Sequence, residues 1–307
     1  MPGHSRSLLD NEALALERER AKAVPKSKVP DPGLADPSGD TRAPAHHLGL
    51  LRRLIYGFYE GRLSKEVVRG RVPRHLAIIL DGNRRFARTN RISDPRTIYA
   101  TGAQKLDEVL DWCHELGVSA VTLWVCSTDN LNRGTEELAA IHSAIADKIT
   151  DLATDPKVHE RGICVRAAGR LELLPDPVMQ AIKLAESATR EYRAMTLTIA
   201  VAYGGREEIV DALRSLLEEC AGRRMAMEEI IAHISPLAVG RHLYSADLPD
   251  PDLIIRTSGE LRLSGFLLWQ SAYSEFYFTD VNWPAFRKID FLRAIRAYQQ
   301  RQRRYGL

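Results

Sequence analysis

Residues 75–88 read HLAIILDGNRRFAR. The run Leu76–Leu80 is apolar, short and rich in branched side chains, which predicts a buried strand. The chain then turns at Asp81-Gly82-Asn83, and arginines follow at positions 84, 85 and 88. A carboxylate after a strand is a candidate metal ligand, and a glycine turn that enters a helix leaves backbone N–H groups for a phosphate. The stretch therefore predicts a metal-assisted diphosphate site.

The same residues allow a second interpretation. Asp-Gly-Asn is also an ordinary turn sequence, and Asp81 would then only cap the helix that follows. The choice between the two depends on whether other strand ends of the chain carry the same chemistry.

The composition indicates a globular protein of 307 residues whose formal net charge of +3 is too small to favour nucleic acid. No apolar run reaches the length of a membrane span, and the N-terminus lacks a signal-peptide core. The cysteines lie far apart without a CxxC pair, which is typical of reduced thiols and leads us to expect a cytoplasmic protein. They are Cys113, Cys126, Cys164 and Cys220.

The first 45 residues are rich in proline and polar side chains, so they bury too little apolar surface to offset their ordering entropy. We predict a disordered N-terminal tail over residues 1–45 and one domain over residues 46–307. Within residues 47–68, apolar side chains recur at helical spacing and basic ones stand apart from them. This pattern predicts a helix that packs on the domain, with peripheral contact to an anionic membrane as the alternative.

Strands and helices alternate after residue 88. The alternation predicts an α/β fold with a mostly parallel central sheet flanked by helices on both faces. Strands are predicted at 118–126, 163–168, 197–202, 253–256 and 275–278. Helices are predicted at 103–116, 135–152, from Asp176, after Arg206 through Leu217, in two pieces within 225–244, and from Asp290. We expect Asp176 and Asp290 to be the N-caps of their helices.

Polar groups follow several of these strands. In an open parallel sheet, ligands bind at the carboxyl ends of the strands. Here those ends carry Asp81, Ser127–Asn130, Gly204–Arg206 and Arg256. We expect them to form one rim, rich in arginine, glycine and hydroxyl groups, above a sheet flanked by apolar helices. Such a site suits a substrate with an anionic head and an apolar tail.

Other phosphate chemistries are excluded by missing motifs. The sequence has no GxxxxGK[ST] of a P-loop NTPase and no GxGxxG after the first strand. It also lacks the GxSxG elbow and the HExxH zinc motif. No Asp-Asp pair occurs, so the aspartate-rich motif of all-helical trans-prenyltransferases is absent.

Four ordered segments resemble motifs of the cis-prenyltransferase family, of the undecaprenyl diphosphate synthase type. They are HLAIILDGNRRFAR, STDNLNR at 127–133, AYGGREEIV at 202–210, and DLIIRTSGELRLSGFLLWQSAYSEFYF at 252–278. The resemblance covers about residues 73–306. DGNRR and LSGFLLWQSAYSE are most similar to actinobacterial short-chain enzymes that make (Z,E)-farnesyl diphosphate.

The resemblance implies roles for individual residues. Asp81 matches the Mg²⁺-binding and catalytic aspartate, Asn130 the residue that assists proton removal, and Glu275 a second metal-contacting carboxylate. The segment that holds the allylic diphosphate is matched by Gly82, Asn83, Arg84, Arg85 and Phe86, with a further diphosphate contact at Arg133. The isopentenyl diphosphate site is matched by Arg256, Arg262, Leu263 and Ser264. An RxG arm, Arg304 to Gly306, matches one that reaches into the partner subunit's site, which implies a homodimer.

Some positions depart from the family pattern. Tyr99 stands where many members have a phosphate-contacting His, Phe86 where Trp is usual, and Leu131 where Trp is common. Asp129 stands where the family usually has Glu, in the substrate-binding segment that begins with Ser127 and Thr128. Arg96 is the nearest match to a further arginine that binds phosphate in the family. Trp124 and Val125 match positions that face the family's tunnel. Long-chain members tend to have a small residue at the position that matches Val125. The larger side chain of Val125 would limit elongation of the prenyl product.

These observations predict a Mg²⁺-dependent enzyme that condenses isopentenyl diphosphate with a short allylic diphosphate, geranyl diphosphate first among them. The product would be a short cis-prenyl diphosphate such as (2Z,6E)-farnesyl diphosphate. Alternatives are a medium- or long-chain synthase and an irregular, lavandulyl-type coupling enzyme, which the change at Asp129 keeps open. A non-catalytic partner subunit would be expected to lack the aspartate found here at Asp81.

Overall fold

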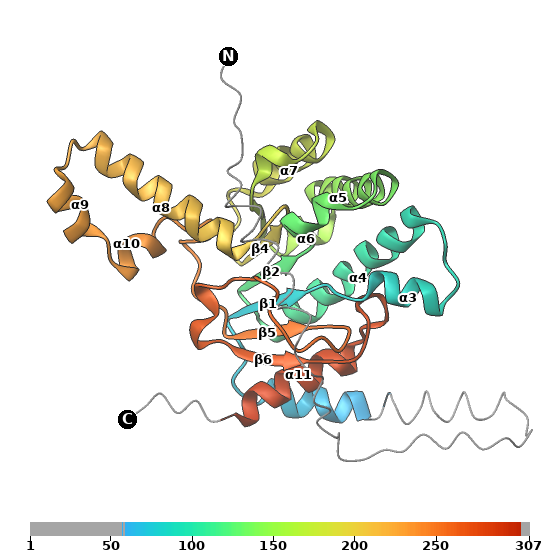
Figure 1. Ribbon diagram of the computed structural model, residues 1–307. Coiled ribbons are helices and arrows are strands. Elements are labelled where there is room, and N and C mark those ends of the chain that lie inside the picture. Colours follow the sequence, from blue (N-terminus) through green and yellow to red (C-terminus); the bar gives the residue numbers. More distant parts are fainter. Residues whose placement is uncertain (1–56, 58, 302–307) are drawn as a thin grey trace, which may run out of the picture. The chain divides into compact units, whose positions relative to one another are not determined.

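Six parallel strands form the central sheet of the computed structural model, which describes residues 57 and 59–301 (Figure 1). The strand order is β3-β4-β2-β1-β5-β6, and every neighbouring pair runs parallel. The predicted α/β fold with a parallel sheet is confirmed. The strands are β1 His75–Ile79, β2 Ala120–Trp124, β3 Ile163–Ala168, β4 Met195–Ala200, β5 Leu253–Arg256 and β6 Glu275–Phe278.

Helices connect most of the strands. The α-helices are α3 Asn83–Thr89, α4 Pro95–Leu116, α5 Thr135–Thr154, α6 Pro156–Glu160, α7 Asp176–Thr189, α8 Gly205–Gly222, α9 Met227–His233, α10 Pro236–Gly240 and α11 Lys288–Gln300. Short 3₁₀ helices are η1 Thr128–Asn132, η2 Leu171–Leu173, η3 Gln270–Tyr273 and η4 Trp283–Ala285. Residues 59–68 are also helical.

Alternate side chains of each strand enter two different apolar clusters, because successive residues of a strand point to opposite faces. Ile78, Leu123 and Ile199 belong to the larger cluster, which includes apolar residues of α4, α5, α7 and α11. Their neighbours Ile79, Trp124 and Ala200 belong to the smaller cluster on the other face. Figure 1 shows α8, α9 and α10 on the opposite side of the sheet from α4 and α5. Both faces of the sheet are therefore covered, as the sequence predicts.

Several helix boundaries differ from the prediction because of their capping residues. α4 begins at Pro95 and not at residue 103, since the Asp94 carboxylate accepts hydrogen bonds from the N–H groups of Arg96 and Thr97. Asp176 is the first residue of α7 and not its N-cap. Asp290 lies in the first turn of α11, where its carboxylate accepts from the backbone N–H of the N-cap, Arg287.

The helix at residues 59–68 packs on the core. Leu63 and Val67 are buried in the larger apolar cluster, and the guanidinium of Arg293 lies 5.7 Å from the centre of the Tyr59 ring. The packing interpretation is confirmed for this part of the predicted helix. The rest of it, the predicted tail over residues 1–45 and the domain start at 46 lie outside the described residues and stay predictions. A search of the described residues finds no helix with the length and apolarity to cross a membrane.

The four cysteines all lie within the described residues, where each has a free and buried thiol. Burial raises the pKa of Cys126 to about 11 and that of Cys113 further still. The thiols of Cys113 and Cys126 are therefore protonated at neutral pH and shielded from solvent.

Gly169, directly after β3, offers a test of the fold. Its φ of +131° is rare for any residue with a side chain, and a Cβ there would overlap the carbonyl oxygen of Val201. We expect Gly169→Ala to lower the free energy of unfolding by about 3 kcal/mol, measured by urea denaturation. The matched control is Gly222→Ala, at an open position in the last turn of α8, which should cost nothing or add up to about 1 kcal/mol. Equal stability losses in both variants would contradict this account.

Candidate active site

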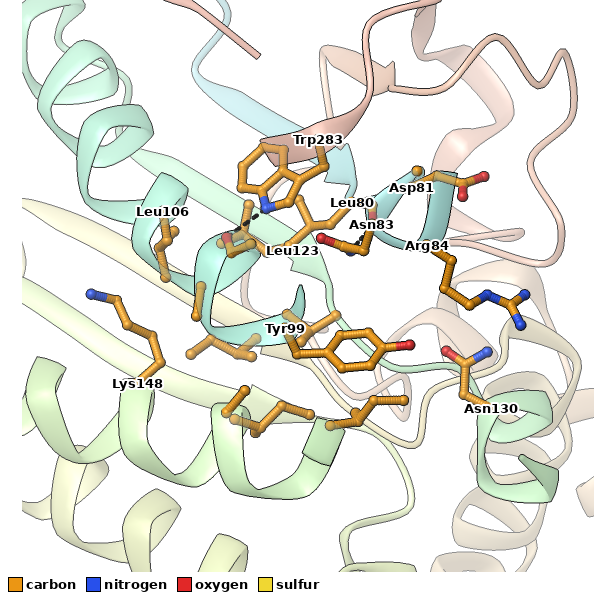
Figure 2. A pocket seen from close by; sticks show the side chains of 18 of the residues that line it. Leu80, Asp81, Asn83, Arg84, Tyr99, Leu106, Leu123, Asn130, Lys148 and Trp283 are labelled. Carbon is orange, nitrogen blue, oxygen red and sulfur yellow. Dashed lines mark hydrogen bonds between the residues drawn. The ribbon is translucent and has the colours of Figure 1, made fainter. Parts of the chain in front are cut away.

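A cavity of about 220 Å³ lies between the carboxyl ends of the central strands and the helices α3, α4 and α5 (Figure 2). Its two ends differ in character. One end is polar, and its lining includes Asp81, Asn83, Arg84, Arg85, Arg88, Tyr99, Asn130 and Arg133. The remainder is mainly apolar, with Leu106, Leu123, Val125, Ile141, Ala144, Ile145, Ile149 and Ile199. The cavity therefore joins a polar region and an apolar region in one space.

The backbone of Asp81 is held by residues distant in the sequence. The Thr257 hydroxyl accepts a hydrogen bond from the Asp81 N–H at 3.0 Å and lies 2.7 Å from its carbonyl oxygen. That carbonyl also accepts from the backbone N–H of Trp283 at 3.0 Å. Trp283 is itself buried, and its indole N–H donates to the Gly102 carbonyl, a bond drawn in Figure 2. Asp81 is thus fixed from β5 and η4 as well as from its own strand.

The side chain of Asp81 pairs with Arg256 at the end of β5. An Nη of the buried arginine donates to Asp81 Oδ2 at 2.8 Å. Burial opposes ionisation of this carboxyl, but the hydrogen bond and charge of Arg256 outweigh it, and the pKa of Asp81 lies below its usual value. Asp81 is therefore an ionised carboxylate at neutral pH.

Gly82, and not Asp81, is the N-cap of α3. It has a φ of +103° and provides no side-chain cap to the helix. A Cβ at this position would meet the Asn282 side chain and Ser258. The turn therefore requires glycine. The interpretation of Asp81 as only a helix cap is therefore wrong. The first turn of α3 begins beside the polar end of the cavity.

A second group of arginines lies on the loop after β5. Arg256 donates to the Ser264 hydroxyl at 2.8 Å and to the Arg262 carbonyl oxygen. Glu260 pairs with two arginines, Arg262 at 2.5 Å and Arg85 at 3.1 Å. The loop thus connects the predicted isopentenyl diphosphate residues with the arginine-rich turn at the start of α3. Leu263 packs against the smaller apolar cluster.

A third charged group surrounds Tyr99. Its hydroxyl donates to Glu137 Oε1 at 2.5 Å and accepts from Arg133 at 2.8 Å. Arg133 also pairs with Glu137 at 3.0 Å, and Arg84 lies 3.8 Å from the same carboxylate. Burial, followed by the hydrogen bond to Glu137, raises the pKa of the Tyr99 phenol well above its usual value. Tyr99 is therefore a neutral hydrogen-bonding group that holds Arg133 at the cavity.

The segment after β2 meets the segment after β4. Ser127 caps η1 by accepting from the Asn130 N–H, and Asn130 Oδ1 accepts in return from the Ser127 N–H. A parallel bridge joins Ser127 to Tyr203, next to Gly204. With Asp81 and Arg256, these contacts bring the carboxyl ends of β1, β2, β4 and β5 together, as predicted. Thr128 belongs to η1 and donates its N–H to the Tyr203 carbonyl.

Some predicted substrate-binding residues do not line this cavity. Phe86 and Leu131 are half-buried beside it, and Arg96 and Asp129 are exposed. Trp124 is a correction to the prediction, because it points to the other face of the sheet from its neighbour Val125. There it stacks on Phe266 at 5.2 Å and donates its indole N–H to the Tyr203 carbonyl. Only Val125 of the predicted chain-length pair faces the cavity.

Glu275 lies apart from Asp81 within one chain, and its predicted metal contact stays a prediction. It begins β6 and is in register with Leu253, whereas Arg256 is in register with Ile79, next to Asp81. Glu275 therefore lies at the amino end of the sheet, roughly 15 Å from Asp81 along the strand direction at about 3.3 Å per residue. Its carboxylate pairs with Arg301 at 2.7 Å. Within one chain, Asp81 and Glu275 do not share a metal ion.

Sequence reasoning missed the carboxylates that orient the arginines, Glu137 and Glu260. A signal for Glu137 was present, since it lies four residues after Arg133, where side chains of a helix are neighbours. Lys148 at the apolar end of the cavity had no local signal. The RxG arm, with Arg304 and Gly306, lies outside the described residues and stays a prediction.

The charges and the shape of the cavity define the class of ligand. Four arginines, at 84, 85, 88 and 133, line the polar end, and forked guanidinium groups bind phosphate oxygens well. The adjoining apolar region excludes water from a hydrocarbon group. A parallel α/β sheet with such a site at its carboxyl edge defines a protein that binds an anionic head joined to an apolar tail.

Comparisons with known proteins agree. The family model of undecaprenyl diphosphate synthases matches residues 79–306. The chain therefore belongs to this family of prenyltransferases and is an enzyme, which confirms the resemblance of its motifs.

Individual relatives differ in their named products. A tritrans,polycis-undecaprenyl-diphosphate synthase (geranylgeranyl-diphosphate specific) of Methanopyrus kandleri is 52% identical over 252 residues, which cover 82% of this chain and 91% of that protein. A (2Z,6E)-farnesyl diphosphate synthase of Thermobifida fusca is 49% identical over 259 residues, 84% of this chain and 100% of that protein. The crystal structure of lavandulyl diphosphate synthase from Lavandula x intermedia with dimethylallyl diphosphate has 32% identity and a TM-score of 0.70, covering 77% and 99% of the two chains.

The Asp81–Arg256 pair makes stability depend on pH. Because the folded pKa of Asp81 lies below its unfolded value, the pair stabilises the fold above about pH 4, and this contribution is lost as the pH falls through the folded pKa. We expect Asp81→Asn to cost about 1 kcal/mol at pH 7, since the aspartate is partly exposed and screened. Urea unfolding of both proteins at several pH values tests this. A difference that does not shrink between about pH 5 and pH 3 would contradict it.

Proposed function

We propose that this enzyme condenses isopentenyl diphosphate with a short allylic diphosphate, with geranyl diphosphate as the preferred primer and (2Z,6E)-farnesyl diphosphate as the product. The observation that carries the proposal is the cavity itself, in which an arginine-rich end continues into an apolar one. The arginines would hold the diphosphate heads, and the apolar part would hold the prenyl chain away from water.

The two groups of arginines suit two diphosphates. Arg84, Arg85 and Arg133 would bind the allylic diphosphate next to the first turn of α3. Arg256, Arg262 and Ser264 would bind the isopentenyl diphosphate on the neighbouring loop. Because both heads are anionic, they repel each other, and cationic side chains on both sides offset that repulsion. Glu137 and Glu260 keep these arginines oriented.

Magnesium fits the chemistry of the polar end. Mg²⁺ in proteins is usually bound by one or two carboxylates together with substrate phosphates. Asp81 is ionised, lines the cavity and has 36% of its side chain exposed, so an ion carried by a diphosphate can reach it. A bound Mg²⁺ would neutralise the allylic diphosphate and make it a better leaving group.

The proposed coupling step joins the two substrates and releases diphosphate. The bond between C1 of the allylic group and its diphosphate oxygen breaks, and the π electrons of isopentenyl diphosphate form the new bond from C4 to C1. A proton then leaves C2 of the isopentenyl unit, and the departing diphosphate accepts it. Asn130, whose side chain lies at the polar end of the cavity, would orient the group that receives this proton (Figure 2).

We also propose that two copies of the chain form a homodimer and that the protein is located in the cytoplasm. The RxG arm at Arg304 to Gly306 resembles one that completes a partner subunit's site, so a homodimer would give each cavity an additional arginine. Peripheral membrane contact through the helix that ends at residue 68 stays an alternative role for that segment.

Two other products have specific support. Similarity to an undecaprenyl synthase favours a longer product, and similarity to a lavandulyl diphosphate synthase favours irregular coupling of two dimethylallyl units. Incubation of the purified protein with Mg²⁺, isopentenyl diphosphate and each short allylic diphosphate distinguishes them, because the dephosphorylated products differ in length and branching on chromatography. A single C15 alcohol with a cis double bond is the expected result.

Asp81→Ala separates an enzyme from a scaffold. We expect at least about a 100-fold loss of product formation, since the carboxylate would hold the metal and Arg256 would lose its partner. Circular dichroism should show a folded variant. The control is Asp176→Ala, an exposed aspartate at the start of α7, which should retain activity. Full activity of Asp81→Ala would contradict the proposed role.

Val125→Ala tests the control of chain length. Val125 lines the cavity, and its truncation adds space beside the prenyl chain. We expect part of the product to lengthen by at least one five-carbon unit, measured with labelled isopentenyl diphosphate. Val210→Ala, at an exposed valine of α8, is the control. Unchanged product length in Val125→Ala would count against this role.

A further inference from the structure

A lysine lies at the apolar end of the cavity. Lys148 comes from α5 between Ile145 and Ile149, which line the same cavity, and only 13% of its side chain is exposed. Figure 2 shows Lys148 and Leu106 at the end away from Asp81, Arg84 and Asn130. A cationic group so far from the diphosphate residues has no role in holding the heads of the substrates.

The lysine is paired across two helices. Its Nζ donates to Oδ1 of Asp107 at 2.5 Å, and Asp107 belongs to α4. The residue before it, Leu106, lines the cavity, so the pair bridges α4 and α5 directly behind the apolar lining. The two charged groups are 41 positions apart in the sequence and meet only because the helices pack side by side.

A second hollow lies behind the pair. It also measures about 220 Å³, and its lining includes Asp107 and Leu110 of α4 together with Asp111, Lys157 and Arg161. Lys148 therefore lines the first cavity and Asp107 lines the second, with their ion pair between them. The residues that line the second hollow are mostly charged, whereas the interior of the first cavity is mainly apolar.

We propose that the Lys148–Asp107 ion pair closes the far end of the substrate cavity and sets the upper limit of the prenyl chain length. This inference rests on the proposed function. A prenyl chain grows away from its diphosphate, so its tail moves toward the end where Lys148 lies. To grow further, the tail must displace the lysine and pass between α4 and α5.

An ion pair resists this displacement better than an apolar side chain of equal size. The Asp107 side chain is 43% exposed, so the resistance comes mainly from the lysine, whose side chain is only 13% exposed. A hydrocarbon tail offers no hydrogen bond to replace the carboxylate, so the ammonium group would be left without its partner in a partly dehydrated place. A methionine at the same position has a similar length but no such attachment, and its flexible chain moves aside readily. The charge of the pair, more than its volume, would therefore act as the barrier.

The alternative is that the pair only connects α4 to α5. In that case, removing it would lower thermal stability and leave product length unchanged. The two roles are separated by measuring product length and stability on the same variants.

The experiment compares variants of the full chain with Mg²⁺, labelled isopentenyl diphosphate and geranyl diphosphate. Lys148→Met removes the charge, Asp107→Ala removes its partner, and Lys148→Arg keeps a cation. The matched control is Lys105→Met, because Lys105 has the same 13% exposure and pairs with Glu108 on α4, but lines neither hollow.

We expect Lys148→Met and Asp107→Ala to make products longer by one or more five-carbon units, with total incorporation within about threefold of the wild type. Lys148→Arg and Lys105→Met should keep the wild-type length. If Lys148→Met or Asp107→Ala folds and still makes products of wild-type length, the inference is overturned. If one of the two variants fails to fold, the product length of the other variant decides. No incorporation by the wild type with any allylic primer would instead overturn the proposed function.

Discussion

The ion pair between Asp81 and Arg256 is the interaction on which the site depends. It joins the carboxyl ends of two adjacent strands, β1 and β5, and the buried arginine also holds the loop that carries Ser264. The buried cation of Arg256 is stable because Asp81 and further hydrogen bonds compensate its charge. The other arginines follow the same pattern on a smaller scale, since Glu137 and Glu260 balance them at the surface of the cavity. The protein thus keeps a dense group of cations oriented beside the cavity.

The parallel sheet explains why the polar and the apolar parts of the site adjoin. Leu123 and Ile199 project from β2 and β4 into the cavity, and the polar segments at Ser127 and Gly204 begin a few residues later on the same two strands. Both strands therefore provide part of the apolar wall, and the segment after β2 also contributes Asn130 to the polar end. The fixed alternation of side chains ensures that Trp124 and Ala200 serve the opposite face, where they pack with Phe266. Head and tail sites are consequently held in a constant relation by backbone hydrogen bonds.

The sequence predicts those parts of the site that are built from neighbouring residues. Asp81 and Gly82 were found because strand, turn and helix follow one another directly. The distance between Glu275 and Asp81 within one chain could not be predicted, because a motif identifies a residue without saying at which end of the sheet its strand begins. Trp124 was misplaced because two consecutive strand residues were assigned to one face. Asp107 and Lys148 could not be found, because neither has a local signal and their contact arises only from the packing of α4 on α5.

In the proposed function, product length is controlled by a few side chains of the cavity. Relatives named for a short product and for a long product share about half of their residues with this chain, so the shared framework must accommodate both. In the proposed function, the residues that limit the product would lie where the growing tail ends and not beside the arginines of the polar end. Apolar side chains at that place can shift by small amounts to admit a longer tail. An ion pair admits a longer tail only if its two charged groups separate. An enzyme that closes its cavity with a charged pair would therefore release a narrower range of lengths than one that relies on bulk alone.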